Sequence, residues 1–142
     1  MNSVRQILSR KKAPAISISP DAPVIEALKL MAEKNVGSII VLQEEKYMGI
    51  LTERDYSRKI VLLGKSSTST RTSEIMSVDL PRLSPEDTVD RCMELMSDKN
   101  IRYLPVFENE KLIGIISMSD VVKQTILAQQ ETIQHLENYI HQ

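Results

Sequence analysis

The sequence is poor in cysteine, aromatic residues and glycine, with one cysteine, no tryptophan, one phenylalanine and four glycines. Because a single thiol can form neither an internal disulfide nor a cysteine-based metal cluster, Cys92 excludes both within one chain. The 18 basic and 19 acidic residues nearly cancel, so charge does not favour nucleic acid or an anionic membrane surface as a partner. No apolar run approaches the roughly 20 residues of a membrane-spanning helix. We therefore expect an intracellular, cytoplasmic protein.

Residues 1–14 are basic but lack the apolar core of a secretory signal, although a short organelle presequence stays an alternative. Arrangements typical of catalysis are also missing: the sequence has no Ser-His-Asp order, no Cys/His pair and no closely spaced carboxylates that could divide acid and base roles. His135 and His141 have no second ligand at metal spacing, so we expect no metal site. An enzyme would have to use Asp55 or Asp120 as its base, and we predict a protein that is not an enzyme.

The chain does contain an internal repeat. Residues 15–62 align without a gap with residues 80–127, at a constant offset of 65 residues. The identical pairs include Ser19-Pro20 with Ser84-Pro85, Lys34-Asn35 with Lys99-Asn100, Gly49-Ile50 with Gly114-Ile115, and Asp55 with Asp120. Such a repeat predicts two equivalent units with a pseudo-twofold relation. Because roughly 50 residues bury little surface alone, we expect the two repeats to fold as one module.

Each repeat predicts the order strand, helix, strand, strand, helix, so the expected fold class is α/β (α+β). Short apolar runs favour buried strands, and apolar residues at helical spacing favour helices. In the first repeat, strands are expected at 15–19, 38–42 and 48–52, with helices from Val24 and over 52–63. In the second repeat, strands are expected at 80–83, 103–107 and 112–117, with helices from Val89 and from Asp120.

Each repeat also opens with a short apolar helical turn. Residues 4–9 resemble residues 72–77, at an offset three residues longer than that of the repeats. A loop change is therefore expected between the turn and the first strand. The predicted divisions are repeat 1 with its opening turn (1–64), an exposed hydroxyl-rich linker (65–71), repeat 2 (72–127) and a C-terminal helical extension (128–142).

One motif recurs where the last strand of each repeat meets the following helix. It consists of Gly, two apolar residues, Thr or Ser, two variable residues and Asp, and it runs from Gly49 to Asp55 and from Gly114 to Asp120. Thr or Ser three residues before an acidic residue is typical of a capping box. The same corner presents free N–H groups and a positive helix dipole, which favour a phosphate, while the carboxylate can accept ribose hydroxyls. The two interpretations are compatible, because a ligand and a cap can use different lone pairs.

These motifs resemble the CBS domain, named after cystathionine β-synthase. The resemblance rests on the opening turn, the Ser-Pro before the first helix, the strand ending in Pro105-Val106 and the corner motif, in one order that repeats; it covers nearly all of residues 1–127. The chain therefore resembles a tandem CBS pair, or Bateman module, with pseudo-twofold symmetry and a long C-terminal helix. It is similar to small stand-alone bacterial CBS-pair signalling proteins and to plant CBSX-type proteins.

CBS pairs typically bind adenosine-containing ligands in clefts between their repeats. The resemblance thus implies AMP, ADP, ATP, NAD(H) or S-adenosylmethionine as a regulatory ligand. Asp55 and Asp120 would hold ribose hydroxyls, Thr52 and Ser117 would contact ribose or phosphate, and Arg102 would contact phosphate. The other residues that the resemblance places in the clefts are Ile16, Gly37, Ser38, Arg54, Pro81, Tyr103, Pro105 and Ser119.

The two implied clefts carry their cations on different elements. Arg102 of the second repeat matches Gly37, and Arg54 of the first repeat matches Ser119. The two sites are therefore expected to differ in affinity or in ligand. The alternatives are that Arg102 is a surface arginine and that Arg54 pairs with Glu53 or with solvent.

The last helix is expected to continue from Asp120 to Ile140. The residues spaced 4-3-4-3-4 along it are Val122, Ile126, Gln129, Ile133, Leu136 and Ile140. This spacing is typical of a coiled-coil seam, apolar except at Gln129. The helix either packs back on its own domain or pairs with a second copy. Because CBS pairs commonly dimerise into a flat disc, we predict a homodimer whose interface includes the tail residues Ile126, Ile133, Leu136 and Ile140.

The leading functional hypothesis is a non-catalytic regulatory module. An adenosine ligand would shift its conformation or its dimer, through differential affinity for two states, and an unknown target protein would respond. The alternative is a structural dimerisation or interaction module with vestigial clefts. Arg102, Arg54 and the presence of Asp at both corners favour the regulatory hypothesis.

Overall fold

The computed structural model describes residues 2–11 and 14–141. The fold is mixed α/β with two repeats and a long C-terminal helix, as the sequence predicts. It contains two compact units: residues 15–80, the middle unit, and residues 1–14 with 81–142, the terminal unit. Each unit has a hydrophobic core of its own.

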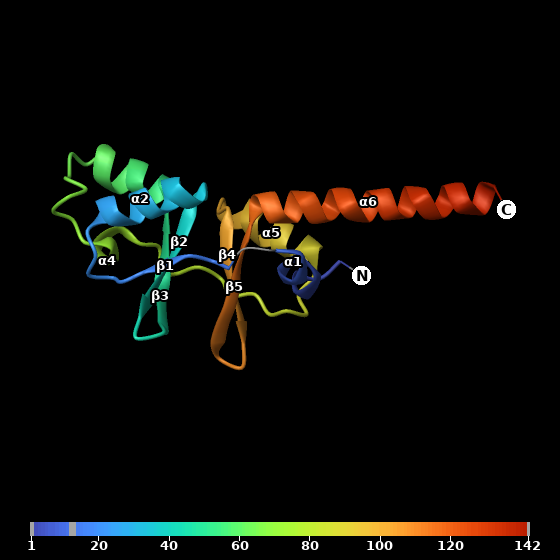
Figure 1. Cartoon of the computed structure of the whole chain (residues 1–142), viewed down its shortest axis with the longest axis horizontal. Helices are drawn as coiled ribbons and strands as arrows, with labels where there is room; N and C mark the ends of the chain where they lie inside the picture. The colour runs from blue at the N-terminus through green and yellow to red at the C-terminus, as the bar shows by residue number, and fades with distance from the viewer. Residues whose placement is uncertain (1, 12–13, 142) are drawn as a thin grey trace. The chain divides into compact units, whose positions relative to one another are not determined.

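The middle unit contains a three-stranded sheet in the order β1-β2-β3, with β1 parallel to β2 and β2 antiparallel to β3. Its elements are β1 (Ser17–Ile18), α2 (Val24–Lys34), β2 (Ser38–Gln43), β3 (Lys46–Thr52), α3 (Glu53–Tyr56), the π-helix η1 (Ser57–Val61) and α4 (Thr72–Ile75) (Figure 1). Val24, Ala27 and Met31 recur at helical spacing in α2, and all three are buried in one core with Ile39 and Leu51.

The terminal unit repeats this plan with a two-stranded sheet. Its elements are α1 (Val4–Arg10), α5 (Val89–Lys99), β4 (Tyr103–Glu108), β5 (Lys111–Ser117) and α6 (Met118–Ile140). The strand predicted at 80–83 is reduced to one parallel bridge between Leu83 and Val106, so that prediction is largely wrong. Only Leu83 of the segment is buried. One buried side chain is not enough to keep the whole segment paired with the sheet.

Both hairpins reverse through two residues with positive φ. The φ values are 49° and 69° at Glu44 and Glu45, and 52° and 67° at Asn109 and Glu110. Two-residue turns with positive φ at both positions match the twist of the strands they join. Local turn geometry therefore follows the internal repeat, although the residue types differ.

The two opening helical turns are exchanged between the repeats. α1, which precedes repeat 1, packs with repeat 2 in the terminal unit, and α4, which precedes repeat 2, packs with repeat 1 in the middle unit. The same two hydrogen bonds dock each turn. The bonds run from Val4 N to Asp87 O (2.9 Å) and Arg5 N to Pro85 O (2.9 Å), and from Thr72 N to Ala22 O (2.8 Å) and Ser73 N to Pro20 O (3.0 Å).

The helix predicted over 52–63 is two pieces instead of one. α3 ends at Tyr56, and η1 continues with wider turns, in which Leu62 N donates to Ser57 O at 3.0 Å. Widened turns of this kind place side chains differently from a regular α-helix. Val61, the last residue of η1, and Leu62 and Leu63 after it are exposed at the surface.

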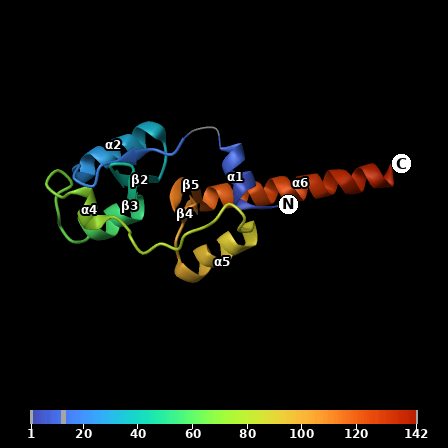
Figure 2. The ribbon, with the colours of Figure 1, turned by 90° about the horizontal axis from the view of Figure 1, so that it is seen from below.

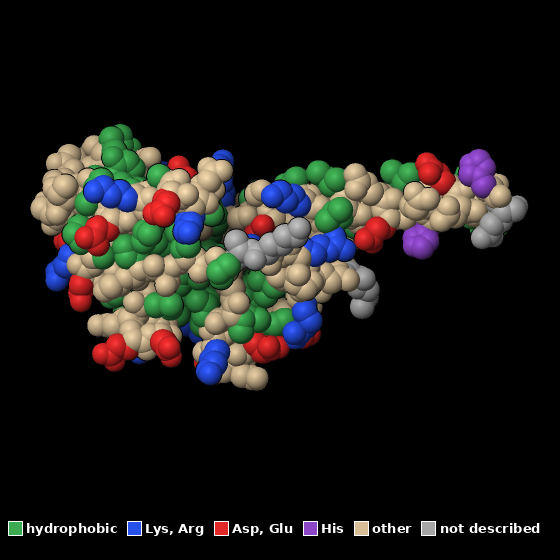
Figure 3. Space-filling model, in the orientation of Figure 1, with side chains coloured by type: hydrophobic (Ala, Val, Ile, Leu, Met, Phe, Trp, Pro, Cys, Tyr) green, Lys and Arg blue, Asp and Glu red, His purple; other side chains and the backbone are tan. Residues whose placement is uncertain are grey.

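α6 packs on its own unit only along its first half. Val121 and Gln124 are buried, and α1 and α5 both contact this part of the helix (Figure 2). Residues 129–141 are all exposed. The alternative that the helix packs back on its own domain is therefore wrong for its second half. Hydrophobic side chains lie open along this helix (Figure 3). Within the described chain, no helix combines the length and the hydropathy needed to cross a membrane.

Candidate functional site

The corner motif of the middle unit forms the predicted capping box at the start of α3. Thr52 Oγ1 accepts a hydrogen bond from Asp55 N at 3.1 Å, and Asp55 Oδ2 accepts from Thr52 N at 3.0 Å. The two bonds satisfy backbone donors that the first turn of a helix leaves unpaired. The box fixes the position of the Asp55 carboxylate at the end of β3.

The Asp55 carboxylate is also saturated by side chains of its own unit. Ser77 Oγ donates to it at 2.9 and 3.2 Å, Lys59 Nζ lies 3.1 Å from Oδ1, and the Thr52 hydroxyl lies 3.0 Å from Oδ2. Asp55 is only 6% exposed. Because a carboxylate has about four acceptor sites, a ligand hydroxyl could bind here only by displacing one of these donors.

The corner of the terminal unit has the same capping box but a different environment. Ser117 Oγ accepts from Asp120 N at 3.1 Å, and Asp120 Oδ2 accepts from Ser117 N at 2.9 Å. Lys11 Nζ donates to Asp120 Oδ2 and to Ile115 O, both at 2.9 Å. In the part of the chain that the structure describes, every bond to the Asp120 carboxylate falls on Oδ2. Its Oδ1 therefore has acceptor capacity for a ligand.

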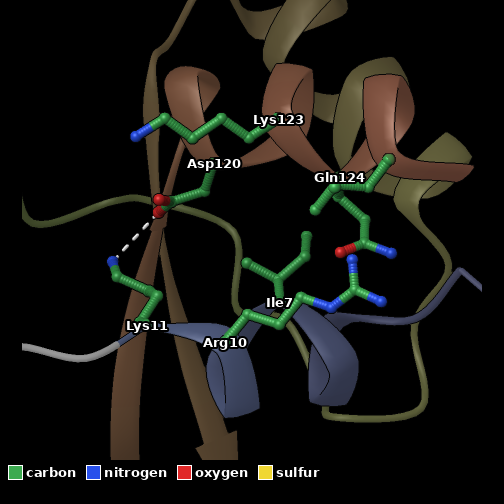
Figure 4. Close-up of a pocket in the computed structure, with 7 residues that line it drawn as sticks. Ile7, Arg10, Lys11, Asp120, Lys123 and Gln124 are labelled. Atoms are coloured by element: carbon green, nitrogen blue, oxygen red, sulfur yellow. Dashed lines mark hydrogen bonds and ion pairs between the residues drawn. The ribbon is translucent and has the colours of Figure 1, made fainter. Parts of the chain in front are cut away.

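A cavity of about 370 Å³ opens beside Asp120. It is lined by Ile7, Arg10, Lys11, Asp120, Lys123, Gln124 and Leu127, from α1, the segment after it and α6 (Figure 4). Three side chains in this lining are cationic and one is anionic, while Ile7 and Leu127 supply apolar surface. Lys11 contacts Asp120, while the guanidinium of Arg10 lies beside Gln124, away from the carboxylate (Figure 4). Cations and an acceptor along one cavity suit a ligand with both phosphate and hydroxyl groups.

The two corners differ because their partners come from non-equivalent positions. Lys59, which pairs with Asp55, corresponds in the repeat to Gln124, which donates instead to Asn2 Oδ1 at 3.3 Å. The cation at Asp120 is Lys11, which comes from the segment after α1. The Asp55 carboxylate is therefore bound by a lysine one helical turn later and by Ser77, and the Asp120 carboxylate is bound by Lys11 at the rim of the cavity.

The residues implied by the family resemblance fall into two groups, one in each unit. In the middle unit, Ser38 pairs with Thr52 in the sheet, and Gly37 O accepts from Glu53 N at 3.1 Å. In the terminal unit, Tyr103 pairs with Ser117, and Arg102 O accepts from Met118 N at 2.8 Å. The start of one strand thus lies beside each corner. The other predicted members are Ile16, packed on the core, and Arg54 in the middle unit, and Pro81, Pro105 and Ser119 in the terminal unit.

The charged partners of both carboxylates, Lys59 and Lys11, are not among the residues predicted from the sequence. Lys59 lies one helical turn after Asp55, a spacing that indicates an ion pair. The basic run at Arg10 and Lys11 was visible, but nothing in the sequence shows that it meets Asp120. Ser77 gave no signal, because 22 residues separate it from Asp55.

Comparison with known proteins establishes the family. The model of the CBS domain matches residues 4–62 and 73–126. The chain belongs to the CBS-domain family. Proteins of this family commonly bind adenosine-containing ligands and often oligomerise.

Two curated relatives support this assignment. The chain is 40% identical over 125 residues to the mitochondrial CBS domain-containing protein CBSX3 of Arabidopsis thaliana, covering 84% of this chain and 61% of that protein. It is 31% identical over 121 residues to the CBS domain-containing protein YhcV of Bacillus subtilis, covering 85% and 84%. Both are named for their domains and not for a reaction. The cytoplasmic location stays a prediction.

Solved structures show the same fold. A candidate signal-transduction protein with CBS domains from Burkholderia ambifaria superposes with a TM-score of 0.84 at 41% identity, covering 90% of this chain and 96% of that one. The hexameric CBS-CP12 protein of bloom-forming cyanobacteria gives 0.73 at 32% identity, covering 84% and 66%. The chain is accordingly a CBS-pair module of the regulatory and signal-transduction type.

Proposed function

We propose that this CBS pair is a non-catalytic regulatory module that binds an adenosine-containing phosphate ligand at the corner of the terminal unit. The supporting observation is the cavity beside Asp120, which is lined by three cationic side chains and by a carboxylate whose Oδ1 has acceptor capacity. Asp55, by contrast, is buried and saturated. Of the two predicted ribose-binding residues, Asp120 is therefore the one ready to bind a ligand.

The binding mode follows from the donors and acceptors at this corner. Asp120 Oδ1 would accept from the ribose hydroxyls while Oδ2 keeps its bonds to Ser117 N and Lys11. An ammonium group has three N–H donors, and in the described chain Lys11 uses two of them, so the third can bind a phosphate oxygen. Lys123 would add a further charge-assisted contact, and Arg10 would do so by leaving Glu131, with which it pairs at 3.4 Å.

This arrangement favours ligands with two or more phosphates. ATP, ADP and NAD(H) present more anionic oxygens to the three cations than AMP does. S-Adenosylmethionine carries a sulfonium cation and no phosphate, so it is expected to bind weakest. A ligand that joins Asp120 on α6 to Arg10 and Lys11 would tie the N-terminal segment to α6, and it would shift conformation by as much as its affinities for two states differ.

Thermal shift with AMP, ADP, ATP, NAD, NADH and S-adenosylmethionine tests this proposal, on protein unfolded and refolded to remove any bound nucleotide. A ligand at 100 times its Kd should stabilise the protein by about 2.7 kcal/mol, a shift of several degrees. Asp120→Asn should abolish the shift and Asp55→Asn should keep it. No shift with any ligand would instead favour a structural module, and a shift lost only in Asp55→Asn would move the site to the middle unit.

We also propose that the module acts as a homodimer through α6. Ile126, Ile133, Leu136 and Ile140 are between 47% and 73% exposed along one face of the helix, and oligomers occur in the family. Sedimentation should show a dimer at micromolar concentration, and the double variant Ile133→Asp, Leu136→Asp should be a monomer. A monomeric wild-type protein would overturn the dimer but leave the ligand proposal standing.

A further inference from the structure

The exposed seam of α6 lies away from the surfaces that the helix uses within its own unit. Val122 and Ile126 are 49% and 47% exposed, although Val121 and Gln124 beside them are buried. At 100° per residue, the seam residues share one face of the helix, and Gln124 and Glu131 fall on the opposite side. That opposite side carries the contacts to α1, including the 3.4 Å pair between Arg10 and Glu131. The whole length of the seam is therefore open to a partner helix.

The residues that flank the seam indicate how a partner helix would be oriented against α6. In heptad terms, Ile126, Ile133 and Ile140 take position a, and Val122, Gln129 and Leu136 take position d. The e positions are Lys123, Gln130 and Glu137, and the g positions are Thr125, Thr132 and Tyr139. Opposite charges thus occur only at the two ends of the e row.

We propose that α6 pairs with α6 of a second copy in antiparallel orientation, with Lys123 of each chain facing Glu137 of the other. This inference rests on the proposed homodimer and specifies its geometry. In antiparallel pairs, e positions face e positions, so two attractive pairs form. In a parallel pair, e faces g, and Glu137 would meet Thr132 while Lys123 would meet Met118.

The seam residues agree with the antiparallel register. Aligning Lys123 with Glu137 places Ile126 opposite Leu136, Ile133 opposite Gln129 and Ile140 opposite Val122. The polar Gln129 then packs beside an isoleucine instead of a second glutamine. The overlap uses the seam from Val122 to Ile140, so the body of each copy lies at the opposite end of the pair.

This geometry also brings the second copy to the cavity. Lys123 lines the cavity beside Asp120 (Figure 4) and is at the same time an e residue of the seam. Glu137 of the second copy would therefore lie at the cavity rim, where its carboxylate and a ligand phosphate would share one cation.

Cysteine cross-linking tests the orientation. Ile126→Cys and Leu136→Cys are mixed in equal amounts under reducing conditions, allowed to exchange subunits and then oxidised, with unmodified protein as the control for Cys92. The antiparallel pair should give mainly mixed cross-links, several-fold above either variant alone. Strong self-cross-linking of each single variant would establish a parallel pair and overturn the proposal, and a monomer by sedimentation would overturn the dimer itself.

Charge reversal gives an independent test that needs no cysteine. Glu137→Lys should weaken dimerisation by about tenfold, because two attractive pairs become repulsive. The double variant Lys123→Glu, Glu137→Lys should restore the affinity to within about threefold. Glu131→Lys, which changes charge equally on the opposite side of the helix, is the matched control. If it weakens the dimer as much as Glu137→Lys, the proposed pairing is wrong.

Discussion

Lys59 and Asp55 form an ion pair one helical turn apart, with Nζ 3.1 Å from Oδ1. Lys59 Nζ also donates to Ile75 O at 2.9 Å, and Ser77 donates to the same carboxylate. Asp55 thus joins α3 to the segment that begins with α4, although these parts are well separated in sequence. The carboxylate serves as a structural anchor of the middle unit.

Asp55→Ala is therefore expected to lower the free energy of unfolding by about 2–4 kcal/mol. The change removes the acceptor of Ser77 and of the Thr52 N–H at a buried place, and it breaks the ion pair of Lys59, which keeps its bond to Ile75 O. Asp120→Ala should lower it by only about 1 kcal/mol, mainly by weakening a helix cap. Urea unfolding of both variants measures these losses. Equal losses would show that the two aspartates contribute equally to the free energy of unfolding.

Lys11→Met should weaken the binding of a polyphosphate nucleotide by about tenfold, because it removes a cation that bridges Asp120 and the ligand. Lys29→Met, an exposed lysine on α2, is the control and should leave the affinity unchanged. Isothermal titration calorimetry measures both. Tighter binding by Lys11→Met would mean that the Lys11–Asp120 pair competes with the ligand.

Gly49→Ala and Gly114→Ala should differ in stability although the two positions are equivalent. An added Cβ at Gly49 would lie 2.6 Å from the backbone O of Ser77, which also accepts from Ile50 N at 3.0 Å. At Gly114 it would lie 2.7 Å from Cδ2 of Leu8, the end of a side chain whose torsions can change to relieve the contact. We expect the free energy of unfolding to fall by about 2–3 kcal/mol in Gly49→Ala and by about 1 kcal/mol in Gly114→Ala. Thermal or urea unfolding measures both losses, and a larger loss at Gly114 would contradict the closer packing of Gly49 against the backbone.

Cys92 should be nearly inert in the folded protein. Burial raises the pKa of its thiol from 9.0 to about 11, which by itself reduces the reactive thiolate about 100-fold at pH 8. A disulfide reagent should therefore react at least about 100-fold faster with the protein unfolded in urea. Fast reaction under native conditions would show that the core around α5 opens locally.

The same thiol predicts the direction of a pH effect. Because its pKa is higher in the folded state, the stabilising contribution is complete below pH 9, and it is lost as the pH rises from 9 toward 11, where the unfolded chain releases the proton first. The free energy of unfolding, measured across this pH range, should decline less in the control variant Cys92→Ala than in the unmodified protein. An equal decline in both proteins would assign the effect to other groups.

Much of the fold could be predicted because it depends on short spacings. The strand pairs, α2, α5 and both capping boxes follow from patterns within a dozen residues, and the repeat follows from comparing the two halves of the sequence at an offset of 65 residues. The predicted strand at 80–83 failed because only Leu83 contributes inward packing there. The helix predicted over 52–63 is wrong in its detail, because the α-helical hydrogen bonds change to π-helical ones after Tyr56. The pattern of apolar residues does not predict this change.

The sequence by itself determined that two CBS repeats are present, where their corners lie and that the last helix carries the apolar spacing typical of a coiled-coil seam. Only the tertiary structure decided which opening turn packs in which unit, and which of the two equivalent aspartates keeps acceptor capacity. The physical reason is that Ser77 reaches Asp55 and Lys11 reaches Asp120 across long stretches of chain. Such contacts depend on how each unit packs around its core, and they cannot be predicted from the residue spacing within a repeat.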